Sequence, residues 1–243
     1  MTRKKYLKEI DLVANTFTEN KTVFLEESRC IMYFLSQWVD KQVGSDYKKV
    51  ALKIWPIGKM AELNIKPFMI DDVSKVIVIE VEYDLRDYYA FNELESRHLE
   101  IIRLLKKSFA AIPSNVNIDR IKLLESLECI KENGFIYTRE LGRWIPNPSK
   151  TVLAKMFVEF NAKEILFCLK LQNKDKTKEW HQVFSRFKPF EVARLYEFWK
   201  LEFQSDYRMV CKFKKHYESI EFDVDMNCKN GIVNLSTPLQ FMR

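Results

Sequence analysis

The chain has 243 residues, of which 47% are apolar and 14% are aromatic, so it is long and apolar enough to fill a core of its own. This composition excludes an intrinsically disordered chain, because low hydrophobicity and a large net charge are both missing. Only 5 Gly are present, and few positions therefore let the backbone lie against a phosphate, which argues against a nucleotide-binding enzyme. The formal net charge is +6.

The five cysteines are scattered, and no two of them form a C-x-x-C pair. This odd number argues against a disulfide framework, and we expect reduced thiols, with Cys168 and Cys211 in the core. The N-terminus begins with basic residues but lacks a following apolar stretch, and the longest uncharged apolar-rich run, residues 30–39, is half the length of a membrane-spanning helix. The sequence therefore predicts a cytoplasmic protein without a membrane partner.

The first part of the chain combines helical and strand periodicities. Segments with apolar residues at helical spacing are separated by two short segments that have the period of a strand. The run at 75–83 begins with consecutive apolar residues and then alternates acidic with apolar residues, which is typical of a strand near the middle of a sheet. The patterns predict helices at 24–44, 92–109 and 117–134 and strands at 48–55 and 75–83.

The second part of the chain is dominated by strand patterns. Residues 143–150 carry two of the seven prolines and are predicted to be a connector. Beyond them the apolar residues alternate with polar ones, except between residues 189 and 203, where helical spacing returns. The patterns predict strands at 151–160, 164–172, 179–187, 206–214 and 218–225, and one helix at 189–203.

Helices and strands occur in blocks, which favours an α+β fold over a doubly wound sheet. We expect helices packed on a largely antiparallel sheet, with a C-terminal half that is a β-meander containing one inserted helix. The expected division is an N-terminal helix-strand-strand-helix part at 1–112, a helix with a proline-containing connector at 113–150, and the meander at 151–243. The alternative is one continuous domain.

Positive charge is concentrated in one window of the sequence. Residues 170–215 contain twelve Lys or Arg and six Asp or Glu, and this difference of +6 equals the net charge of the whole chain. Alternation places Arg208, Val210, Lys212 and Lys214 opposite a core face of Tyr207, Met209, Cys211 and Phe213. It places Trp180, Gln182, Phe184 and Arg186 together on one face of another strand. If these two strands are neighbours, they form a basic sheet face with aromatic side chains.

The candidate binding residues are cations and one aromatic residue of this window. They are Lys174, Lys176, Lys178, Trp180, Arg186, Lys188, Arg208, Lys212 and Lys214. We predict a non-enzymatic intracellular binding protein, of the inhibitor or immunity type, that recognises an acidic protein partner through this region. The alternative is a protein that binds or processes single-stranded nucleic acid by stacking and phosphate neutralisation. A plain solvated sheet edge also accounts for the lysines.

No catalytic motif is present. The sequence lacks an H-E-x-x-H motif, a phosphate-binding loop and a nucleophile elbow, so we expect no catalytic residues and no cofactor. His98 lies on a predicted helix face and is expected to be packed. The acidic group Glu80, Glu82, Asp84 and Asp87 follows a predicted strand, and carboxylates of this kind can hold Mg²⁺. The sequence does not fix their geometry and leaves the oligomeric state open.

Overall fold

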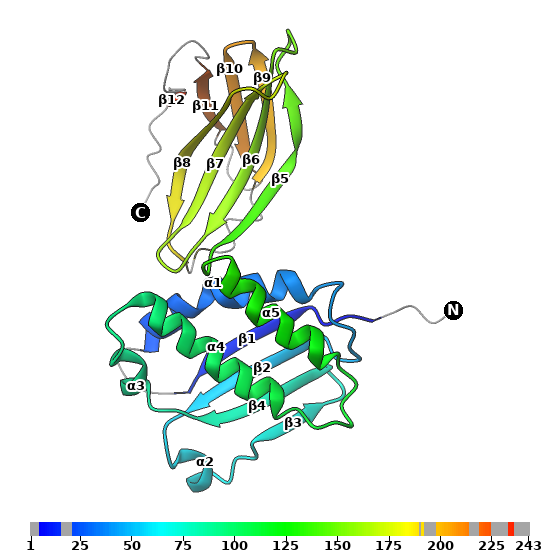
Figure 1. Ribbon diagram of the computed structural model, residues 1–243, viewed down its shortest axis with the longest axis vertical. Coiled ribbons are helices and arrows are strands. Elements are labelled where there is room, and N and C mark those ends of the chain that lie inside the picture. Colours follow the sequence, from blue (N-terminus) through cyan, green and yellow to red (C-terminus); the bar gives the residue numbers. More distant parts are fainter. Residues whose placement is uncertain are drawn as a thin grey trace. The chain divides into compact units, whose positions relative to one another are not determined.

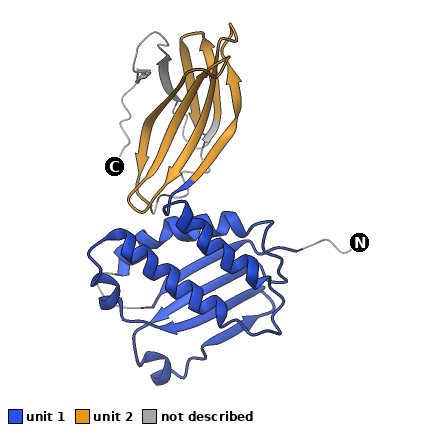
Figure 2. Ribbon diagram, viewed as in Figure 1, with its two compact units in different colours: residues 1–137 blue, residues 138–243 orange. Residues whose placement is uncertain are grey.

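The computed structural model describes residues 5–15, 21–189, 191, 198–213, 219–224 and 233–235. The chain forms two compact units, residues 1–137 and residues 138–243, which Figure 2 shows in different colours. The α+β class is confirmed, since helices and strands are both abundant and are grouped along the chain. Within the described part of the chain, no helix combines the length and the apolar composition needed to cross a membrane.

The first unit contains a four-stranded sheet with the order β1-β2-β4-β3. Three of its strands are parallel, and β3 is antiparallel to β4. The prediction of a strand near the middle of the sheet is confirmed, because β4 lies between two others. The first strand was not predicted, since its alternating run is short and no turn residues mark its ends. The bounds are β1 (Glu9–Ala14), β2 (Lys49–Trp55), β3 (Phe68–Asp71) and β4 (Val76–Glu82).

The helices of the first unit protect its sheet. Ser36 hydrogen-bonds to both backbone groups of Ile10, at 3.0 and 3.1 Å, so α1 protects the free edge of β1. Figure 1 shows α4 and α5 crossing in front of the sheet, and their apolar residues Ile101, Leu105 and Leu127 are buried. The bounds are α1 (Lys21–Val39), α2 (Lys59–Glu62), α3 (Leu85–Tyr89), α4 (Leu94–Ala110) and α5 (Arg120–Glu132). The three predicted helices are thus confirmed, although α1 ends at Val39 and not at residue 44.

The second unit contains two antiparallel four-stranded sheets, with the orders β5-β6-β7-β8 and β12-β11-β10-β9. The Sγ of Cys211 in β10 lies 3.4 Å from the Sδ of Met156 in β6, and both residues are buried. The two sheets therefore face each other as a sandwich. The bounds are β5 (Tyr137–Pro146), β6 (Val152–Phe160), β7 (Ile165–Asn173), β8 (Glu179–Phe187), β9 (Phe198–Ser205), β10 (Arg208–Phe213), β11 (Ser219–Val224) and β12 (Val233–Leu235).

Two predictions for this unit were wrong in part. The helix predicted at 189–203 is a strand from residue 198 onward, and residues 190 and 192–197 lie outside the described residues. Here Leu201 and Phe203 alternate with polar neighbours, so the sequence fits a strand that pairs with β10 as well as a helix. The connector predicted at 143–150 begins as β5, because an edge strand tolerates proline at its end.

The predicted faces of β8 and β10 were also partly wrong. Tyr207 is 69% exposed because it lies in the turn before β10, whereas Val210 is buried. In β8 the register shifts opposite Phe167 and Cys168, which interrupts the alternation. Trp180 is paired with Leu171 and Arg186 with Leu166, so the two lie on opposite faces of the sheet, and Phe184 is buried.

A single basic sheet face is not formed. β8 pairs with β7, and β10 pairs with β9 and β11, so the two strands belong to different sheets. Lys214 and the side chain of Phe213 lie outside the described residues. The cations of the window that the structure describes are therefore distributed over several surfaces of the second unit, and their positions are considered one by one.

Candidate binding surface

Three hairpin turns lie at the same end of the sandwich (Figure 1). The backbone N–H of Lys174 donates to the carbonyl oxygen of Thr151 at 2.9 Å, which joins the β7–β8 turn to the β5–β6 turn. The backbone N–H of Ser149 donates to Oδ1 of Asp206 at 2.7 Å, which joins the β5–β6 turn to the β9–β10 turn. We call this surface the hairpin end, and define it as residues 147–151, 173–178 and 205–208.

Two of these turns share one design, with the sequence N-x-x-K-T at 147–151 and at 173–177. In the first, Oδ1 of Asn147 accepts the backbone N–H groups of Thr151 and Val152, at 2.8 and 3.0 Å. In the second, Oδ1 of Asn173 accepts the backbone N–H of Lys178 at 2.9 Å. Each asparagine also donates to the threonine hydroxyl of its own turn, at 3.1 and 2.9 Å. Side-chain hydrogen bonds therefore brace both turns.

The lysine of each turn adopts a left-handed backbone conformation, with φ 57° at Lys150 and 62° at Lys176. Its N–H donates to the carbonyl oxygen of the turn's asparagine, at 2.9 and 3.0 Å. A side chain at such a position costs about 1 kcal/mol relative to glycine. Lys41 and Lys75 in the first unit have the same conformation, so the conformation does not by itself mark a binding residue. Within the described residues, the matched bracing of two adjacent turns occurs at the hairpin end alone.

The lysines of the hairpin end are exposed. Among the described residues, none is within ion-pair distance of Lys150, Lys174, Lys176 or Lys178. The nearby carboxylates accept hydrogen bonds within the turns instead. Oδ1 of Asp175 accepts the hydroxyl of Thr177 at 2.7 Å and its N–H at 3.1 Å, and these hydrogen bonds lower the pKa of Asp175. The hairpin end thus presents positive charge to solvent while its carboxylates stabilise the loops.

Among the predicted binding residues, Arg186 and Lys212 form ion pairs. The guanidinium of Arg186 pairs with Glu164 at 2.7 Å, and Lys212 pairs with Glu202. Glu202 also pairs with Lys200 at 2.5 Å, and hydrogen bonds from Lys200 and Lys212 lower its pKa to about 2. These cations are already neutralised and are weaker candidates for contact with a partner.

The remaining predicted residues are divided between the two ends of the sandwich. Arg208 is exposed and follows Tyr207 at the hairpin end. Trp180 is half-buried near the start of β8, and Lys188 is exposed after the far end of that strand. The hairpin end therefore brings together Lys174, Lys176, Lys178 and Arg208, and it separates them from Arg186, Lys188 and Lys212.

Sequence reasoning missed two residues of this surface, Lys150 and Tyr207. Lys150 lies outside the basic window and was assigned to the connector. The repeated N-x-x-K-T spacing was a signal that could have grouped Lys150 with Lys176. Tyr207 was assigned to the core by extending the alternation of β10 one residue too far, into the turn.

The acidic residues at the end of β4 do not converge. Glu80 accepts from the Trp55 indole at 2.5 Å and lies 3.3 Å from Nζ of Lys53. Glu82 accepts the backbone N–H of Met60, while Asp84 caps α3 by accepting the N–H of Arg86. Searched over the described residues, the chain has no group of three or more His, Cys, Asp or Glu that could hold a metal ion.

His98 and the core cysteines are packed, as predicted. His98 is 4% exposed, and its ring lies 4.9 Å from that of Phe135. Burial lowers the pKa of His98 to about 4, so the imidazole is neutral at pH 7. Cys168 and Cys211 are free and buried, and burial raises the pKa of Cys168 to about 11. A thiol in this state is a poor nucleophile.

Comparisons with family models, with curated proteins and with solved structures give no match to this chain. The hairpin end offers several exposed cationic side chains and one exposed phenol ring on short, braced loops. Exposed cations of this kind can attract anionic groups over a distance and form charged hydrogen bonds with them.

Proposed function

We propose that this protein is a non-enzymatic binding protein whose hairpin end recognises an acidic surface of a partner protein. The observation that carries the proposal is the pair of matched turns. They place Lys150 and Lys176 in adjacent, braced loops, while the nearby carboxylates are used inside the loops. A surface of preorganised cations loses little entropy when it binds, which favours recognition of a complementary anionic surface.

The distribution of charge between the units supports this proposal. Residues 1–137 contain 21 Lys or Arg and 21 Asp or Glu, whereas residues 138–243 contain 19 and 13. Since 19 minus 13 is +6, the second unit carries the whole net charge of the chain. A concentrated positive charge steers an acidic partner toward this unit.

A protein partner is favoured over single-stranded nucleic acid because the aromatic side chains that the structure describes in this unit do not form a stacking surface. Phe184 is buried, and Trp180 is half-buried on the sheet face that carries Leu171. The hairpin end retains one exposed aromatic residue, Tyr207. Single-stranded nucleic acid is usually held by several stacked rings, whereas tyrosine beside cations is typical of protein interfaces.

Fluorescence anisotropy of the full chain tests this proposal. The probes are labelled polyglutamate, single-stranded DNA and duplex DNA, each at low and at physiological salt. The test variant is Lys150→Gly/Lys176→Gly, which removes two charges and relaxes two left-handed positions. The matched control is Lys41→Gly/Lys75→Gly, which makes the same two changes in the first unit.

We expect polyglutamate to bind and the hairpin-end variant to bind it more weakly, with the control unchanged. Equal weakening in both variants would mean that only the net charge matters, and would remove the hairpin end from the proposal. Tighter binding of single-stranded DNA than of polyglutamate, lost in the hairpin-end variant alone, would replace the protein partner with nucleic acid.

A further inference from the structure

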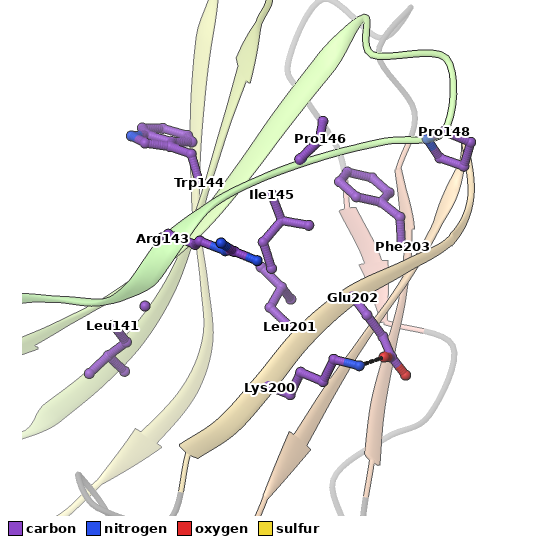
Figure 3. A pocket seen from close by; sticks show the side chains of 11 residues that line it. Leu141, Arg143, Trp144, Ile145, Pro146, Pro148, Lys200, Leu201, Glu202 and Phe203 are labelled. Carbon is purple, nitrogen blue, oxygen red and sulfur yellow. Dashed lines mark ion pairs between the residues drawn. The ribbon is translucent and has the colours of Figure 1, made fainter.

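A cavity of about 730 Å³ lies between β5 and β9, in the second unit (Figure 3). Its walls are the edge strands of the two sheets, since β5 ends one sheet and β9 ends the other. The apolar part of the lining consists mainly of Leu141 and Ile145 from β5 and Leu201 and Phe203 from β9. The cavity is therefore a groove along the open side of the sandwich.

The groove exposes strand edges that can pair with another strand. Within the described residues, β5 pairs with β6 alone and β9 pairs with β10 alone. The outer edge of each strand therefore has N–H and C=O groups available for an added strand. Pro146 lacks an N–H group, so pairing on β5 is confined to the residues before it.

Gly142 lies on the β5 side of this groove. It is exposed, has φ 76°, and stands within the strand rather than in a turn. A glycine inside a strand marks a bulge or a place where another backbone approaches closely. The chain has only 5 glycines, and one of them occupies this edge. This feature favours β5 over β9 as the strand that receives a partner.

The charges of the groove are predominantly positive. Figure 3 shows Arg143 and Ile145 pointing from β5 toward β9, whereas Trp144 points to the opposite side. Arg143 is exposed, and among the described residues it has no ion-pair partner. On β9, Glu202 is neutralised by Lys200 and Lys212, which leaves an excess of cations along the groove.

We propose that this groove binds an extended, acidic segment of the partner protein, which adds to the edge of β5 as a further strand. Leu141, Arg143 and Ile145 alternate along β5, so residues opposite them in an added strand follow the order apolar, acidic, apolar at every second position. The inference deepens the proposed function and rests on it for the role of the second unit as the binding module. The residues of β5 that carry this inference lie outside the hairpin end, although Pro148 belongs to both surfaces.

Anisotropy with three labelled peptides tests the groove in the full chain. The first is Thr-Val-Thr-Glu-Thr-Val-Thr, which places a carboxylate between two valines at strand spacing. The second has lysine in place of the glutamate. The third keeps the glutamate but carries N-methyl groups on alternate backbone nitrogens, which prevents strand pairing. Arg143→Glu is the test variant, and Lys163→Glu, at an exposed position of the same unit, is the matched control.

We expect the glutamate peptide to bind about tenfold more tightly than either of the others. Arg143→Glu reverses the preference, so that the lysine peptide binds more tightly, while Lys163→Glu keeps it. Hydrogen exchange in residues 141–145 slows when the glutamate peptide is bound. Failure of the glutamate peptide to bind, equal binding of the N-methylated peptide, or an unchanged preference in Arg143→Glu would each overturn the proposal.

The groove and the hairpin end can fail separately. If Lys150→Gly/Lys176→Gly binds polyglutamate like the unaltered chain but the glutamate peptide still depends on Arg143, the hairpin end is not the recognition surface and the groove remains. If polyglutamate depends on those lysines but the peptides do not distinguish Arg143→Glu, the proposed function remains and strand addition is rejected.

Discussion

The two units of this protein use their charged residues differently. In the first unit the interior carboxylates are paired: Glu27 accepts hydrogen bonds from Arg97 at 2.8 and 2.9 Å and from the Tyr88 hydroxyl at 2.7 Å. In the second unit Lys150 and Lys176 extend from braced turns, without ion pairs among the described residues. Paired charges stabilise the first unit, whereas we propose that the excess positive charge of the second is available to a partner.

The largest expected effect is the loss of the paired carboxylate in the first unit. Glu27→Ala leaves the Arg97 guanidinium and the Tyr88 hydroxyl without their acceptor in a largely buried place, and we expect it to destabilise the unit by about 3 kcal/mol. Hydrogen exchange then accelerates in α1 and α4, while β6, β7 and β8 exchange as before. Equal acceleration in the second unit would contradict the separate roles of the two units.

The next largest expected effect is a pH dependence of stability that originates in the first unit. Burial lowers the pKa of His98 from 6.5 to about 4, against the opposing influence of Glu27 and with a further contribution from Arg97. The unfolded chain therefore binds more protons between these values, and stability falls as the pH drops from about 6.5 to 4, by about 3 kcal/mol. Urea unfolding of His98→Leu should show a weaker pH dependence over this window, and the exposed-site variant His181→Leu should retain it.

A smaller effect on stability is expected when the asparagines of the two matched turns are substituted. Asn147 is 3% exposed and its side chain makes three hydrogen bonds, so we expect Asn147→Ala to cost about 2 kcal/mol. Asn173 is half-buried and makes two, so Asn173→Ala should cost about 1 kcal/mol. Urea unfolding of the two variants measures the difference. A larger cost at Asn173 would show that the two turns are not braced in the same way.

The three long helices and most strands were predictable because their apolar spacing is long and regular, whereas the short helices α2 and α3 were not predicted. Residues 94–110 and 152–160 keep one period throughout, and so do residues 165–173. Residues 198–203 could not be assigned in this way, since alternation there coincides with helical spacing and pairing with β10 decides the outcome. Short strands such as β1 were not predicted for a related reason, because a few alternating residues are too weak a signal.

The candidate surface was only partly predictable. Sequence proximity grouped Lys174, Lys176 and Lys178, and these residues do lie together. Lys150 joins them through the hydrogen bond between two turns, which is a contact between distant parts of the sequence. The burial of Phe184 was not predictable from the sequence. The register shift in β8 moves side chains to the other face without changing the residue types.

The smallest expected change in stability concerns the lysines themselves. Lys150→Gly and Lys176→Gly each relax a left-handed position, so stability should be unchanged or rise by about 1 kcal/mol or less. Urea unfolding of the two variants checks this. Clear destabilisation by either substitution would show that the lysine side chain supports the fold and is not reserved for a partner.

The central claim is tested most directly by titrating labelled polyglutamate with the unaltered chain, with Lys150→Gly/Lys176→Gly and with Lys41→Gly/Lys75→Gly at one salt concentration. We expect the hairpin-end variant to bind about tenfold more weakly, while the first-unit control retains its affinity. Equal affinities in all three proteins would contradict recognition through the hairpin end.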